Sequence, residues 1–125
     1  MVYIAPAGWQ LTVRRRLDSK VGIHLAKGAL NDLHVPSADV MMLSVAEVFR
    51  SLAMGVIMTG MGADGARGME EICHQGGLTV GQDEPSCTVY GMPRSCAEMH
   101  VLKRVVPLRQ IPQQIMQATG YRRRQ

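Results

Sequence analysis

The stretch that decides the fold occupies residues 55–80 and reads GVIMTGMGADGARGMEEICHQGGLTV. Its first five residues form a continuous apolar run, typical of a strand that is buried on both faces of a sheet. A glycine-rich turn follows at residues 60–65, and then apolar residues recur at helical spacing, at Met69, Ile72 and Cys73. Two glycines end this helix before an apolar strand resumes at residue 78. Residues 55–82 therefore predict a βαβ unit.

The segment before this unit predicts an antiparallel hairpin. Residues 10–16 and 20–25 are expected to pair around the turn Leu17-Asp18-Ser19. Residues 2–4 also read as a short strand, which Pro6 closes.

Helix signals follow the hairpin and the βαβ unit. Ser37 is a suitable N-cap with Asp39 in the first helical turn, and this helix is expected to reach about Ser51. Gly91 opens a further helix, and residues 101–108 and 111–118 read as a short strand and a closing helix. The predicted fold class is thus α/β, a parallel sheet flanked by helices with an N-terminal antiparallel hairpin.

Length and composition narrow the function classes. With 125 residues, 46% of them hydrophobic and 19% charged, the chain is globular and is either one domain or a piece of one. Its apolar runs fall far short of the ~20 residues that span a bilayer. No secretory signal is visible, so we expect a cytoplasmic protein without membrane insertion. Three cysteines without C-x-x-C spacing are expected to be reduced thiols rather than a disulfide framework or zinc site.

The positive charge is local. Six of the fourteen Lys and Arg residues lie in two triplets, at residues 14–16 and 122–124, and the chain has only five aromatic residues. Nucleic-acid binding favours basic residues interleaved with aromatics, so no nucleic-acid partner is expected. The triplets are interpreted as a charged strand edge and a solvated tail.

The glycine-rich turn permits two interpretations. Gly60, Gly62 and Gly65 satisfy the G-x-G-x-x-G pattern, and Asp83 follows the next strand, as in a dinucleotide site. However, Asp64 lies where the pyrophosphate would bind, and its carboxylate would compete for the same helix amides. The turn is therefore expected to present Asp64, either as a plain cap of the following helix or as a reactive group. None of the four histidines has metal-ligand spacing to a second ligand.

Residues 55–69 resemble the signature of the CheB protein-glutamate methylesterase catalytic domain. Further segments that are similar to this family in the same order lie at residues 3–6, 36–40, 44–46 and 82–93. The resemblance implies a Ser-His-Asp triad that hydrolyses glutamate methyl esters, and deamidates glutamines, on methyl-accepting chemotaxis receptors, with no metal or organic cofactor.

Within this resemblance, the family's catalytic aspartate matches Asp64. The methionine of the turn matches Met61, whose amide, with neighbouring Gly62, is expected near the oxyanion. Asp64 would hold the imidazole in the right tautomer, so in the complete enzyme Asp64→Asn is expected to lower turnover by several orders of magnitude with little loss of stability. At Gln10 the family often has a histidine, which alters the rim of the substrate site.

Two segments of the family do not occur in this sequence, namely those that carry the serine and the histidine. Residues 1–119 are therefore expected to be part of a catalytic domain, inactive alone, with residues 120–125 as a disordered basic tail. The incomplete sheet is expected to self-associate. A dinucleotide-binding module and a degenerate CheB-like interaction domain are the alternatives.

Overall fold

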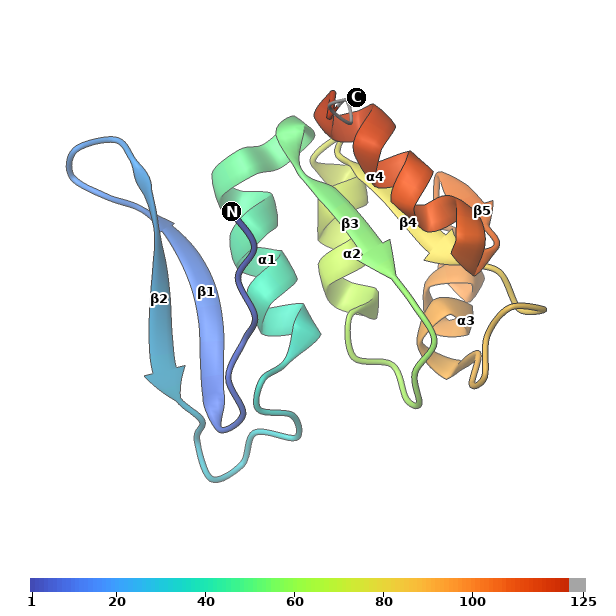
Figure 1. The fold of residues 1–125 in the computed structure, drawn as a ribbon. Helices are drawn as coiled ribbons and strands as arrows, with labels where there is room; N and C mark the ends of the chain where they lie inside the picture. Colours follow the sequence, from blue (N-terminus) through green and yellow to red (C-terminus); the bar gives the residue numbers. More distant parts are fainter. Residues whose placement is uncertain (122–125) are drawn as a thin grey trace.

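The computed structural model describes residues 1–121, which form two sheets and four α-helices (Figure 1). The strands are β1 (Trp9–Arg15), β2 (Val21–Lys27), β3 (Met54–Ile57), β4 (Leu78–Gln82) and β5 (Arg104–Val106). The helices are α1 (Ala38–Phe49), α2 (Ala66–His74), α3 (Gly91–Glu98) and α4 (Ile111–Thr119), with 3-10 turns at Arg50–Leu52 and Leu108–Gln110. The predicted fold class is confirmed. Of the predicted tail, residues 122–125 lie outside the described part of the chain.

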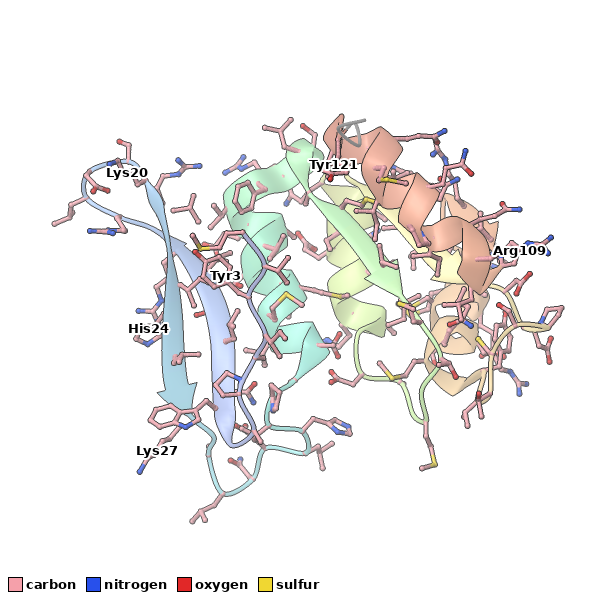
Figure 2. All side chains as sticks on the ribbon, in the orientation of Figure 1. Tyr3, Lys20, His24, Lys27, Arg109 and Tyr121 are labelled. Carbon is pink, nitrogen blue, oxygen red and sulfur yellow. The ribbon has the colours of Figure 1, made fainter. Side chains whose placement is uncertain are left out.

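The hairpin forms where the sequence predicts it. β1 and β2 pair antiparallel, with Leu11 opposite Leu25, and the turn between them places Ser19 at a φ of 65°. The strand predicted at residues 2–4 is wrong. Within the described residues no strand pairs with this segment, and its side chains are 61% to 89% exposed. The apolar run instead passes in front of β1 and α1, where Tyr3 marks it (Figure 2).

Helix α1 joins the hairpin to the rest of the molecule (Figure 1). It begins after Ser37, whose Oγ accepts a hydrogen bond from the Val40 amide, as expected for an N-cap. The helix ends two residues before the predicted Ser51, because Arg50 leaves helical geometry with a φ of 49°. Its other side packs against α2 so closely that a Cβ atom on Gly68 would overlap the Cβ of Met42.

The three-stranded sheet is parallel, with β4 at its centre. Helices α2 and α3 lie on one face and α4 lies on the other (Figure 1). Strand β5 covers only part of the predicted 101–108 span. The buried core joins α1, α2, α3 and the sheet and consists of Met42, Ala46, Ala53, Ile57, Ala66, Met69, Ile72, Cys96 and Val101. Because the strands are parallel, the loops that follow β3 and β4 meet at one edge of the sheet.

Candidate active site

Asp64 lies in the turn between β3 and α2, at the carboxyl end of a parallel strand, as the sequence predicts. The side chain is half-buried and lines a cavity of about 610 Å³. The cavity lies between this turn, the amino-terminal end of α1 and the loop before it. Asp64 is thus open to a cleft.

Three donors from the start of α1 hold the Asp64 carboxylate. Oδ1 accepts from Ser37 Oγ at 2.9 Å and from the Asp39 amide at 3.0 Å. Oδ2 accepts from the Ala38 amide at 2.7 Å. Asp64 therefore caps α1, a helix 25 residues earlier in the chain, and receives the favourable end of its dipole.

The cap of α2 comes from Asp39 in return. Asp39 Oδ1 accepts from the amides of Gly65 and Gly68 at 3.0 and 2.8 Å. The expectation that Asp64 would be satisfied by the helix that follows it is therefore wrong. Asp64 precedes the N-cap of α2, which is Gly65, and its side chain points to α1 instead. The two helices exchange carboxylate caps.

The surroundings of Asp64 favour its ionised form. Partial burial by itself would raise the pKa of this carboxyl, but the hydrogen bonds from the Asp39 and Ala38 amides and from Ser37 lower it. The positive field of His34 adds to this effect, and the net pKa of Asp64 lies below its ordinary value. The site therefore presents a fixed anion to the cavity.

His34 is the histidine that the structure brings to this site. Its residue lines the cavity together with Asp64, whereas His24 is exposed on β2 and projects away from α1 (Figure 2). The loop of His34 is fixed by Gln10, which is 8% exposed. The side chain of Gln10 donates to the His34 carbonyl at 2.9 Å and accepts from the Ser37 amide at 2.9 Å. The position at which the family often has a histidine thus supports the start of α1.

Met61 and Gly62 lie at the other end of the same turn. The Met61 side chain is 84% exposed, and Gly62 has a φ of 91° with open space around its missing Cβ. The turn is anchored by Thr59, whose Oγ1 donates to the Val89 carbonyl at 3.0 Å and accepts from the Val89 amide at 2.9 Å. Gly91 also packs against it, since a Cβ there would lie 3.1 Å from the Gly60 carbonyl oxygen and from the Gly62 amide nitrogen.

The geometry argues against the dinucleotide interpretation. The amides of Gly65 and Gly68, which would receive a pyrophosphate, already donate to the Asp39 carboxylate. The Asp83 carboxylate closes its own loop by accepting from the Ser86 amide and hydroxyl at 3.1 and 2.6 Å.

Two further findings concern residues 1–121. Within them, no group of three or more His, Cys, Asp or Glu side chains could hold a metal ion, and no helix is long and apolar enough to cross a membrane.

The three cysteines are free, and burial, with the charge of Asp39, raises the pKa of Cys96 to about 11.

The roles of Ser37 and Asp39 at Asp64 were not predicted from helix signals alone. Both residues lie in the 36–40 segment that carries part of the family resemblance, and this was the signal that could have identified them. Hydrogen bonds across 25 to 29 residues leave no local pattern in the chain.

Comparison with known proteins decides the family. The sequence model described as CheB methylesterase matches residues 1–115. This chain belongs to the CheB methylesterase family. The crystal structure of the Thermotoga maritima CheB methylesterase catalytic domain is similar, with a TM-score of 0.86 and 32% identity over 92% of this chain and 60% of that chain.

Two curated relatives of this chain are enzymes of one type. A protein-glutamate methylesterase/protein-glutamine glutaminase 2 of Vibrio vulnificus is 47% identical over 111 residues, 89% of this chain and 32% of the relative. A protein of the same enzyme type from Desulfitobacterium hafniense is 40% identical over 122 residues, 97% of this chain and 31% of the relative. The chain therefore spans about a third of the length of these relatives.

Proposed function

We propose that this chain supplies the acid of a Ser-His-Asp triad in a protein-glutamate methylesterase that acts on methyl-accepting chemotaxis receptors in the cytoplasm. Its substrates are glutamate methyl esters and, by deamidation, glutamines. The observation that carries the proposal is the Asp64 carboxylate, held ionised by three hydrogen bonds beside a cavity, in the turn that matches the family signature.

Asp64 acts through an imidazole in this mechanism. The serine Oγ attacks the ester carbonyl while the imidazole takes its proton, and the carboxylate stabilises the imidazolium that forms. The imidazolium then gives the proton to the leaving methoxide, so that methanol departs, and water hydrolyses the acyl-enzyme in the same way. Asp64 stays ionised throughout, which agrees with the direction of its pKa shift.

The turn at Met61 and Gly62 is proposed to stabilise the negative charge that develops on the ester oxygen during the reaction. We assign the Met61 amide to the oxyanion of the tetrahedral intermediate, with Gly62 next to it. Anchoring of this turn by Thr59 and Val89 supports the assignment, because an oxyanion donor is effective only when its position is fixed before the reaction.

Residues 1–119 are proposed to be part of the catalytic domain, with the serine and the histidine supplied from outside them. The test compares the 125 residues with the longest natural reading frame that contains them, by methanol release from methylated receptors. The longer protein is expected to release methanol, with or without EDTA, whereas the 125 residues release none above background.

Three outcomes of this test would contradict the proposal. Methanol release by the 125 residues at the rate of the longer protein would refute the shared triad. No release by the longer protein would favour the degenerate interaction domain. Activity that EDTA removes and a divalent ion restores would refute cofactor-free chemistry.

A separate measurement tests the dinucleotide module. A rise in Tm with NAD would favour that module, since only a ligand that binds the folded state stabilises it.

Self-association is a separate proposal for the isolated chain. Among the described residues β3 pairs with β4 alone, so its other edge keeps unpaired amide and carbonyl groups. The 125 residues are therefore expected to form a dimer or larger oligomer through a sheet edge or an exchanged element. Light scattering at low micromolar concentration checks this, and a single species near 13.7 kDa would contradict it.

A further inference from the structure

The hydrogen bonds at Asp64 use its two oxygens unequally. An ionised carboxylate offers about four acceptor positions, two on each oxygen. Oδ1 uses both of its positions, for Ser37 Oγ and the Asp39 amide, whereas Oδ2 uses one, for the Ala38 amide. Within residues 1–121, one acceptor position on Oδ2 thus has no donor.

The residues that orient this carboxylate are themselves held in place by further hydrogen bonds. Ser37 Oγ donates to Asp64 and accepts from the Val40 amide at 3.3 Å, so the hydroxyl proton has a defined direction. The Asp39 amide donates to Asp64, and the Asp39 carboxylate accepts from the amides of Gly65 and Gly68. A rotation of the Asp64 side chain would therefore break its hydrogen bonds to the start of α1.

We propose that Ser37 and Asp39 are positioning residues for Asp64, and that they leave Oδ2 as the oxygen that receives the imidazole N–H. The second part rests on the proposed function, because the imidazole belongs to the triad. The first part concerns this chain alone and stands without any enzymatic activity.

Other charged groups near Asp64 must be separated from the effect of Ser37. Asp32 and His34 from the loop before α1, Asp39 from α1 and Arg67 from α2 line the same cavity. None of these groups is removed by a substitution at Ser37. A change in the Asp64 pKa in a Ser37 variant therefore reports on the loss of the Ser37 hydroxyl.

The first experiment measures the Asp64 pKa by carbon NMR of labelled aspartates. It uses the longest natural reading frame that contains this chain, with the signal assigned by its loss in Asp64→Asn. Ser37→Ala is expected to raise the Asp64 pKa, and Ser37→Thr, which keeps the hydroxyl, is not. Ser37→Gly repeats the test with a residue that still caps helices well, in case the alanine variant folds poorly.

The matched control is Ser44→Ala. Ser44 lies on the same helix, and its Oγ accepts from the Val13 amide at 3.0 Å and donates to the Met41 carbonyl at 2.6 Å, without contact to Asp64. Its replacement removes a comparable pair of bonds and is expected to leave the Asp64 pKa unchanged. An unchanged pKa in both Ser37→Ala and Ser37→Gly would overturn the positioning role of Ser37.

The second experiment measures methyl ester hydrolysis by the same variants. Loss of one hydrogen bond to a charged group predicts that Ser37→Ala lowers kcat about tenfold, with KM little changed and Ser37→Thr restoring the rate. Asp39→Ala, which leaves two amides of α2 unpaired, is expected to lower kcat similarly. Asp39→Asn, whose amide oxygen still accepts, is expected to restore most of it. Unchanged kcat in Ser37→Ala and Asp39→Ala would overturn positioning in catalysis.

The structure of the longer protein tests the choice of oxygen. An imidazole nitrogen within hydrogen-bond distance of Oδ2, with Ser37 still on Oδ1, is the expected result. An imidazole on Oδ1 with Ser37 displaced would overturn the assignment. Absence of any esterase activity would refute the proposed function, whereas the NMR titration would still decide whether Ser37 positions Asp64.

Discussion

The two ends of the turn between β3 and α2 are built in different ways. At one end Asp64 is half-buried and receives three hydrogen bonds from the start of α1. At the other end the Met61 side chain is 84% exposed, and the backbone is fixed by hydrogen bonds between Thr59 and Val89 and by the close approach of Gly91. The charged group is thus held by direct hydrogen bonds from two backbone amides and one hydroxyl, whereas the Met61 amide is placed indirectly, by the anchoring of the backbone around it.

This difference has a consequence for mutational tolerance. The Asp64 end depends on the chemistry of a few donors, so conservative replacements that remove one donor are expected to be costly. The Met61 end depends on the position of its backbone, so the identity of the exposed side chain is expected to matter little and the absence of a Cβ at Gly91 to matter greatly.

Gly91→Ala is expected to have the largest effect on the Met61 end. Its new Cβ would lie 3.1 Å from the Gly60 oxygen and from the Gly62 nitrogen, so the turn must shift by a few tenths of an ångström. Misplacement of catalytic groups on this scale predicts a fall in kcat of about 10- to 100-fold in the longer protein. The Asp64 pKa, measured by NMR, is expected to stay unchanged.

The matched control for this variant is Gly22→Ala. A Cβ on Gly22 meets only the Cγ and Cδ atoms of the flexible Arg16 side chain, on the hairpin. Its kcat is expected to equal that of the wild type. A Gly91→Ala enzyme with full activity would show that the turn is not held by packing.

Asp64→Asn is expected to destabilise the protein, contrary to the expectation from the sequence. One carboxylate oxygen becomes an N–H₂ group, so a donor at the start of α1 loses its acceptor in either orientation of the amide. This predicts a loss of about 1–3 kcal/mol in the free energy of unfolding at neutral pH. Met61→Ala, at the exposed end, is expected to change it by no more than about 0.5 kcal/mol. Chemical denaturation compares the two, and equal losses would contradict the proposed difference.

The stability that Asp64 provides is expected to depend on pH. Its folded pKa lies below the ordinary value of 3.8, so the unfolded chain binds the proton more tightly than the folded one. The contribution is therefore present in full above the ordinary pKa and is lost as the pH falls through the folded pKa. The stability difference between wild type and Asp64→Asn is expected to be constant at neutral pH and to shrink below about pH 4. A difference that stayed constant in acid would contradict the lowered pKa.

The sequence identified the parts of the site that local patterns encode. The apolar run, the glycine turn and Asp64 follow one another in the chain, and the βαβ unit and the hairpin were predicted correctly. The exchange of caps between α1 and α2 was not, because Asp39 has the same signature whether its carboxylate serves its own helix or another. Residues 2–4 read as a strand because a short apolar run does not reveal whether a pairing partner lies within the chain.

The most direct test of the account is turnover by Asp64→Asn in the longest natural reading frame that contains this chain. Methanol release from methylated receptors is measured for this variant, for Met61→Ala and for the wild type, each checked for a folded state. A fall of about 10⁴-fold is expected for Asp64→Asn, because an imidazole in the wrong tautomer cannot accept the serine proton. A folded Asp64→Asn enzyme with the wild-type rate would contradict the role of Asp64 as the acid of the triad.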